Sequence, residues 1–229
     1  MAVALGQAGA RIVLVARRQQ PLADAVSDLE KLGVTAHAHP ADVADRDALK
    51  ATVDTILQSY GAPDILVNAA GINLRPPLSD LTESDWDATL AANLTAPFIL
   101  GQACGPLMAA RGSGRIINVV SQQAFRAYGN SGAYGASKAG LVALTRSQAE
   151  AWSSRGVMCN AVAPGVVQTP LTAAVFEDED RARAHAARTM VGRNGAPEDF
   201  EGVVVWLASR ASDAVTGQTI FVDGGYSAT

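Results

Sequence analysis

The sequence predicts an α/β protein built on a doubly wound parallel sheet. Short runs of apolar, β-branched residues alternate with longer amphipathic stretches along the 229 residues. Most of the short runs are apolar at successive positions, which is typical of strands buried on both faces. The composition is close to that of an average globular protein, with 48% hydrophobic and 17% charged residues. No repeat or linker-like stretch interrupts the pattern, so a single domain over residues 1–229 is expected.

Six short segments, rich in Val, Ile and Leu, are expected to form the strands. They are residues 11–16, 34–38, 64–68, 115–120, 157–162 and 218–222. Seven longer segments with apolar residues at helical spacing are expected to form helices. They are residues 1–8, 20–32, 45–59, 82–111, 132–154, 172–188 and 197–208. Each later helix can carry the chain back across the sheet to the start of the next parallel strand.

The start of the chain departs from this order, because a sheet of this type begins with a strand and this chain begins with a helix. Residues 1–8 carry the helical pattern and end at Gly9, with no capping residue before them. One interpretation is an N-terminal helix that packs on the sheet. The interpretation we favour is that a first strand, and the turn that follows it, are missing from the sequence.

Charge and composition exclude several classes of partner. The net charge is −4 and lysine and arginine form no cluster, so nucleic acid is not expected as a partner. No apolar run approaches the roughly 20 residues that span a bilayer, and no secretory signal opens the chain. A cytoplasmic protein without membrane contact is therefore expected. Cys104 and Cys159 lie in apolar segments and are expected to be buried and reduced.

Two polar clusters are expected to have structural roles. His37 and His39 share one side of a predicted strand, but no third ligand is spaced to join them, so no metal site is expected. The acidic run 177–180 is expected to be the solvated start of a helix, where the helix dipole favours negative charge.

The residues that point most clearly to catalysis follow the fourth predicted strand. Ser121 ends this strand, and Tyr134 and Lys138 follow at positions i and i+4 of a predicted helix, on one face and one turn apart. A free tyrosine hydroxyl titrates near 10, and a neighbouring ammonium group lowers that pKa by stabilising the phenolate. Tyr134 could then exchange a proton with an alcohol or a carbonyl, while Ser121 holds the same substrate oxygen.

These three residues resemble the Ser–Tyr–Lys centre of the short-chain dehydrogenase/reductase family, and the resemblance continues along nearly the whole chain. Four further motifs match in order and spacing: Asp42-Val43, Asn68-Ala69-Ala70-Gly71, Pro164-Gly165-Val166-Val167-Gln168-Thr169 and Val222-Asp223-Gly224-Gly225. Ala69 replaces the second Asn of the family's N-N-A-G turn. The resemblance implies a Rossmann-like fold and hydride transfer between a nicotinamide cofactor and a secondary alcohol or ketone.

The resemblance also implies the roles of individual residues. Tyr134 would transfer the proton, Lys138 would lower its pKa and bind the ribose, and Ser121 would hold the substrate oxygen. Asn93 matches the helix Asn that completes the family's catalytic tetrad by organising a water and proton path to the lysine. The residues expected to bind the cofactor are Arg17, Asp42, Val43, Asn68, Ala69, Gly71, Tyr134, Lys138, Pro164, Gly165, Val167 and Thr169.

One motif of the family is absent, and its absence affects the cofactor prediction. The T-G-x-x-x-G-x-G turn, which holds the cofactor pyrophosphate at a helix N-terminus, does not occur. Aligning residues 8–13 with the family places Met1 just beyond that turn, so the first strand and the turn are expected to be missing and cofactor affinity to be weakened. Where members that use NAD carry an acidic residue, this chain has Ala16-Arg17-Arg18, and Arg17 can pair with the extra phosphate of NADP. NADP is therefore the preferred cofactor, with NAD as the alternative.

For the substrate, residues 71–77 and 121–123 look similar to sugar-acid members of the family, such as gluconate 5-dehydrogenases and ketodeoxygluconate reductases. Arg75 could bind a carboxylate and Gln123 a polyol, and the helix near 172–188 falls where the family has a mobile lid. The alternatives are a 3-oxoacyl thioester reductase and a catalytically silent binding protein that lost its phosphate loop. The family also suggests a homo-oligomer, a tetramer.

Overall fold

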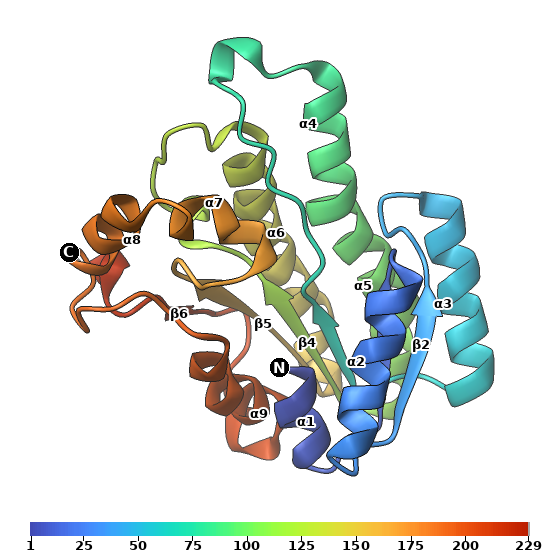
Figure 1. Cartoon of the computed structure of the whole chain (residues 1–229). Coiled ribbons are helices and arrows are strands. Elements are labelled where there is room, and N and C mark those ends of the chain that lie inside the picture. The colour runs from blue at the N-terminus through green and yellow to red at the C-terminus, as the bar shows by residue number, and fades with distance from the viewer. Residues whose placement is uncertain (229) are drawn as a thin grey trace.

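Parallel strands form the centre of the protein, and helices cover them on both sides (Figure 1). The computed structural model describes residues 1–228. The strands in this range are β1 (Ile12–Ala16), β2 (Ala36–Pro40), β3 (Ile65–Asn68), β4 (Gly114–Val119), β5 (Val157–Pro164) and β6 (Thr219–Val222). Every strand pairs with its neighbours in parallel, which confirms the predicted α/β fold class.

The helices also follow the predicted order. They are α1 (Ala2–Gln7), α2 (Gln19–Lys31), α3 (Arg46–Tyr60), α4 (Glu83–Leu90), α5 (Ala96–Arg111), α6 (Gly132–Trp152), α7 (Ala173–Phe176), α8 (Glu179–Ala186) and α9 (Glu201–Ala208). The predicted helix 82–111 is interrupted by a π-helical turn, η2 (Ala91–Thr95), between α4 and α5. The predicted helix 172–188 is two helices, because the Asp178 carboxylate accepts a hydrogen bond from the Arg181 amide and caps a new helix there.

The second strand begins two residues later than predicted. The Val34 amide donates a hydrogen bond to the carbonyl of Leu29, so Val34 closes the end of α2 rather than opening β2. The two histidines of this strand pack against Tyr60 on α3: the His37 ring stacks on it with centroids 4.9 Å apart, and His39 Nε2 lies 3.4 Å from its hydroxyl. Both histidine rings therefore pack against α3.

The strands are divided between two sheets, one of order β1-β2 and one of order β3-β4-β5-β6. Within residues 1–228, no strand lies between β1 and β3, and a cavity of about 760 Å³ separates them. Apolar side chains of β1, β3, α3 and α5 line most of this cavity. The expectation that a first strand is missing stays a prediction.

The two sheets are held in one molecule by their helices. Leu5 of α1 packs with Val204 and Leu207 of α9 in a core cluster that also contains Ile12 of β1 and Ile117 of β4. Figure 1 shows α1 beside α9 at one end of the sheets. Helix packing therefore spans the division between the sheets where backbone hydrogen bonds do not.

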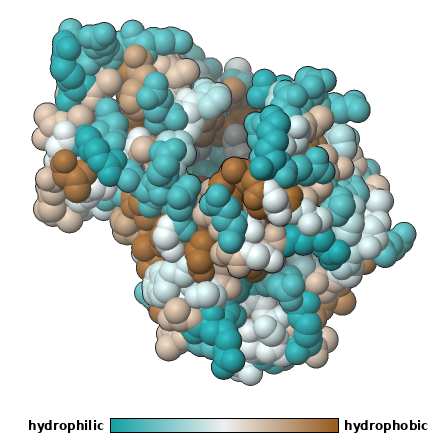
Figure 2. Space-filling model, turned by 60° about the horizontal axis from the view of Figure 1, so that its bottom comes forward, coloured by the Kyte–Doolittle hydropathy of each residue, from teal (hydrophilic) through white to brown (hydrophobic). Residues whose placement is uncertain are grey.

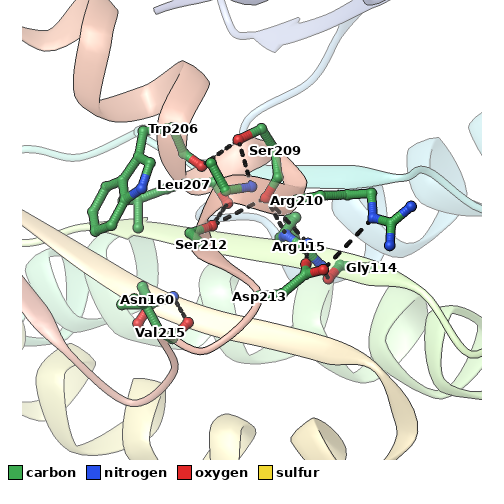
Figure 3. Close-up of polar contacts among 11 residues, drawn as sticks. Gly114, Arg115, Asn160, Trp206, Leu207, Ser209, Arg210, Ser212, Asp213 and Val215 are labelled. Carbon is green, nitrogen blue, oxygen red and sulfur yellow. Dashed lines mark hydrogen bonds and ion pairs between the residues drawn. The ribbon is translucent and has the colours of Figure 1, made fainter.

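The C-terminal end of α9 is tied to the sheet by a buried cation. Arg115 on β4 donates from Nε and Nη2 to the carbonyl of Ser209, at 3.4 and 3.2 Å, and forms an ion pair with Asp213 (Figure 3). Its side chain is only 10% exposed, so these partners satisfy a charge that burial would otherwise make costly.

The cysteines lie inside the protein and the visible surface is mostly polar (Figure 2). Cys104 and Cys159 are buried and free, as predicted. In Figure 2 most of the visible surface is hydrophilic or neutral, and hydrophobic residues gather beside a hollow near the middle of that face. Among residues 1–228, no helix is long and apolar enough to cross a membrane.

Candidate active site

Three separate parts of the chain bring together the four residues of the predicted tetrad. Ser121 lies just after β4, Tyr134 and Lys138 lie in the first two turns of α6, and Asn93 lies in the π-helical turn. All four side chains are buried. Because strand ends at one edge of a parallel sheet meet the helices that follow them, this placement is where α/β proteins build binding sites.

Tyr134 is near both other groups of the Ser–Tyr–Lys centre. The side chain of Ser121 acts on the Tyr134 hydroxyl and favours its phenolate form. Lys138 Nζ lies 5.8 Å from the centre of the Tyr134 ring and donates a hydrogen bond of 2.8 Å to the carbonyl of Val119. The end of β4 therefore positions both Ser121, which follows the strand, and the ammonium group, which is bound to Val119.

Asn93 is held firmly by the loop that follows β3. Its Oδ1 accepts a hydrogen bond of 2.8 Å from the amide of Ile72, and its Nδ2 donates to the carbonyl of Ile72 at 2.9 Å. Nδ2 also lies 3.0 Å from the hydroxyl oxygen of Ser137 on α6. The π-helical turn lets one side chain connect two elements in this way, and such turns occur frequently at functional sites.

Burial shifts the pKa values of both titratable tetrad residues. It lowers the pKa of Lys138 from 10.5 to about 8, because the charged ammonium group loses hydration. Burial raises the pKa of Tyr134, while the hydrogen bond from Ser121 and the charge of Arg75 oppose that rise. The net direction at Tyr134 is thus opposite to the lowering expected from Lys138, because desolvation of the phenolate outweighs the favourable contacts.

Two of the predicted cofactor residues are glycines that pack closely against other parts of the protein. A Cβ atom at Gly71 would lie 3.0 Å from Asn93 Oδ1 and 3.5 Å from Lys138 Nζ, so the loop after β3 passes directly beside two residues of the tetrad. A Cβ at Gly165 would lie 3.0 Å from Asp223 Cα, so the segments that follow β5 and β6 also pack closely. A larger residue at either position would push these neighbours apart.

The other predicted cofactor residues lie along the ends of the strands. Arg17 Nη1 lies 3.6 Å from Asp42 Oδ2, so the residues predicted for the NADP phosphate and the adenine are neighbours. Asn68 ends β3, and Pro164 ends β5. The remaining predicted cofactor residues are Val43 and Ala69, which line the cavity beside β1, and Val167 and Thr169, which follow β5.

The two predicted substrate residues differ in their surroundings. Arg75 Nη2 donates to the carbonyl of Gly129 at 3.3 Å, and its charge acts on the Tyr134 hydroxyl, so it lies near the tetrad. Gln123 Oε1 accepts a hydrogen bond of 2.8 Å from the hydroxyl of Ser131. Gln123 therefore already supports the start of α6.

Several polar residues of the site were not predicted from the sequence. Ser137 contacts Asn93, and its position three residues after Tyr134 on α6 could have indicated it. Gln122 is buried and contacts Tyr128 and His185, and no local pattern in the sequence indicates these long-range contacts. A further set joins β3 and β4 to α6 through buried hydrogen bonds: Asn68, Asn118, Thr145 and Gln148.

Known proteins are similar to this sequence over nearly its whole length. The sequence model of the family described as enoyl-(acyl carrier protein) reductase matches residues 1–227. A gluconate 5-dehydrogenase of Gluconobacter oxydans is 38% identical over 225 residues, which cover 98% of this chain and 88% of that protein. A 3-oxoacyl-[acyl-carrier-protein] reductase of Thermotoga maritima is 38% identical over 222 residues, which cover 96% of this chain and 88% of that protein.

A solved structure has the same arrangement of elements. The crystal structure of a gluconate 5-dehydrogenase from Burkholderia cenocepacia, in complex with NADP and tartrate, matches with a TM-score of 0.94 and 37% identity. The match covers 100% of this chain and 89% of that one. Together with the family match and the predicted tetrad, these similarities show that the chain belongs to the short-chain dehydrogenase/reductase family of oxidoreductases.

Proposed function

We propose that this protein transfers hydride between a nicotinamide cofactor and a secondary alcohol or ketone of a sugar acid, such as gluconate or a ketogluconate. The observation that carries the proposal is the buried arrangement of Ser121, Tyr134 and Lys138, with the Lys138 ammonium group held at the end of β4 by the Val119 carbonyl. The names of the relatives support the sugar-acid class, since one is a gluconate 5-dehydrogenase at 38% identity.

Each residue has a distinct part in the proton transfer. In alcohol oxidation, the phenolate form of Tyr134 accepts the proton of the substrate hydroxyl, while Ser121 donates a hydrogen bond to the substrate oxygen. A nicotinamide cofactor, when bound, would supply the acceptor for the hydride from the carbon that carries this hydroxyl. Lys138, with a pKa of about 8, can exchange a proton near neutral pH, and Asn93 fixes the loop and helix beside it.

NADP is the preferred cofactor in this proposal, with NAD as the alternative. Arg17 offers a cation at the end of β1, and the solved gluconate 5-dehydrogenase of Burkholderia cenocepacia holds NADP. Arg17 pairs with Asp42 at 3.6 Å while both side chains are largely exposed, so a phosphate can compete for the guanidinium group. Breaking the exposed Arg17–Asp42 pair costs little free energy.

Two alternatives are tested by the same assay. The similarity to the reductase of Thermotoga maritima supports the first alternative, a 3-oxoacyl thioester reductase. The second alternative, a silent binding protein, would bind cofactor without turnover. The assay measures NADPH oxidation with 5-keto-D-gluconate and with acetoacetyl-coenzyme A. We expect a higher kcat/KM for the sugar acid; a higher value for the thioester favours the reductase, and NADPH binding without turnover of either favours the binding protein.

The homotetramer and the cytoplasmic location expected from the sequence stay predictions. Size-exclusion chromatography with light scattering measures the first directly, and a dimer or monomer would contradict it.

A further inference from the structure

A second hollow, of about 420 Å³, opens beside the proposed active site. Its lining comes from the loop after β4, the segment after α8 and the C-terminal turn: Arg126, Ala127, Tyr128, Gly129, Arg188 and Tyr226. We call these residues the arginine pocket. Two guanidinium groups and two phenol rings are unusual neighbours in a chain of net charge −4, and the sequence analysis assigned no role to Arg126, Tyr128 or Tyr226.

Aromatic stacking holds the wall of this pocket in place. Tyr226 is buried, with the ring of His185 stacked on it at 4.6 Å and the ring of Tyr128 at 6.0 Å between centroids. The Arg188 guanidinium lies over the Tyr226 ring, 4.5 Å from its centre. A guanidinium group stacked on an aromatic face is oriented before a ligand arrives, which reduces the entropy lost on binding.

Two cations act on the pocket. Arg126 and Arg188 both oppose the rise in pKa that burial causes at Tyr128. Within the described part of the chain, the carboxylate that acts on His185 beside the pocket is Asp223, and its two oxygens accept hydrogen bonds from the amides of Gly225 and Ser227. Arg188 has no ion pair and donates no side-chain hydrogen bond within residues 1–228.

Two contacts connect the arginine pocket to the tetrad. Gln122 directly follows Ser121, and its Nε2 donates to the hydroxyl of Tyr128. Its Oε1 is buried with no partner among residues 1–228, which leaves an acceptor for a ligand hydroxyl. From the other side, Arg75 donates to the carbonyl of Gly129 in the pocket while its charge acts on Tyr134.

We propose that the arginine pocket binds the carboxylate of the substrate, with Arg188 as its main contact, while the reacting carbon lies between Ser121 and Tyr134. This inference rests on the proposed function, because it identifies the acid end of the same sugar-acid substrate. A planar guanidinium group pairs with a carboxylate through two parallel hydrogen bonds, and a tyrosine hydroxyl can hold a neighbouring sugar hydroxyl. Arg188 thus acts as a specificity-determining residue for acids over neutral polyols.

The test compares Arg188→Gln with Arg183→Gln, a control on α8 whose exposed side chain pairs only with Glu179 and Asp180 among the described residues. Calorimetric titration with D-gluconate and with its neutral analogue D-sorbitol measures binding without turnover. We expect Arg188→Gln to raise the Kd for gluconate about tenfold or more. The same substitution should change the Kd for sorbitol by less than about twofold. Arg183→Gln should match the wild type with both ligands.

Kinetics separate this inference from the proposed function. With 5-keto-D-gluconate and NADPH, Arg188→Gln should raise KM about tenfold with kcat nearly unchanged. An unchanged Kd and KM, an equal loss for gluconate and sorbitol, or no binding of gluconate by the wild type would each overturn the carboxylate site. Gluconate binding that depends on Arg188, in a wild-type protein without turnover, would instead overturn the proposed function.

Discussion

The Lys138 ammonium group is buried at the site, and this burial lowers the stability of the folded protein. The group is buried and donates to the Val119 carbonyl, and burial lowers its pKa from 10.5 to about 8. Below pH 8 both folded and unfolded chains carry the proton, so the cost of the buried charge is fully present. Between pH 8 and 10.5 the folded chain loses its proton first, and the cost disappears as the pH rises.

We therefore expect Lys138→Met to be more stable than the wild type at neutral pH while losing activity. A shift from 10.5 to about 8, less the lost hydrogen bond, gives a gain of about 2 kcal/mol near pH 7 that vanishes above pH 10.5. Urea unfolding at a series of pH values measures it. Exposed Lys50→Met is the matched control and should show no such gain; equal stability of Lys138→Met and wild type at pH 7 would contradict the account.

At the residue scale, the placement of Tyr134 and Lys138 could be predicted from the sequence, and the contacts that support the site could not. Tyr134 and Lys138 were predictable because helical spacing alone places i and i+4 on one face. Gln122 and Tyr128 were not, because their contact depends on how the loop after β4 folds back. The direction of the pKa shift at Tyr134 was also missed, since burial is a property of the packed structure and not of the spacing.

At the scale of elements, a buried cation adds to the core packing that positions α9. Arg115 joins β4 to the turn after α9 through the carbonyl of Ser209 and the carboxylate of Asp213 (Figure 3). Arg210 also approaches Asp213, at 3.7 Å, but its side chain is 97% exposed. The same carboxylate thus has one buried and one exposed partner.

Asp213→Ala should lower the free energy of unfolding by about 1–3 kcal/mol, because Arg115 loses its charged partner while staying buried. Arg210→Ala removes only the exposed ion pair with Asp213 and should change the free energy of unfolding by less than about 0.5 kcal/mol. Thermal and urea unfolding of both variants provide the comparison. Equal effects of the two substitutions would show that the buried contact has no special weight.

The element boundaries show which local signals the sequence carries. Strand and helix order was predicted from apolar spacing, because buried parallel strands and amphipathic helices have different periods. The π-helical turn at Ala91–Thr95 was not, since nothing in Ala-Ala-Asn-Leu-Thr distinguishes it from an α-helix. Its cause is long-range: Asn93 bonds to the Ile72 backbone after β3.

At the scale of the whole molecule, the division into two sheets leaves two strand edges facing one cavity. The Ile12 amide donates to the carbonyl of Thr35, so the backbone groups of Ile12 face β2. The Asp64 carbonyl accepts from the amide of Arg115, so the backbone groups of Asp64 face β4. Because backbone groups of successive residues in a strand point to opposite sides, the amides of every second residue in β1 and β3 point toward the cavity instead. Those residues, Val13, Val15, Ile65 and Val67, all line it.

This arrangement predicts a pattern of hydrogen exchange. The amides of Val13, Val15, Ile65 and Val67 should exchange faster than those of their neighbours Leu14 and Leu66, by on the order of a hundredfold, because only the latter are paired within a sheet. Exchange followed by nuclear magnetic resonance resolves the single amides. Equal protection along each strand would mean that both edges are paired.

The central claim is that Tyr134 transfers the proton in an oxidoreductase reaction, and the replacement Tyr134→Phe tests it most directly. This change removes one oxygen and keeps the ring, so thermal unfolding should stay close to that of the wild type. Turnover of NADPH with 5-keto-D-gluconate should fall by about 10³-fold or more, since phenylalanine has no group that can transfer the proton. Tyr60→Phe, which alters a tyrosine stacked on His37, should keep wild-type turnover. Wild-type kcat/KM in Tyr134→Phe would contradict the account.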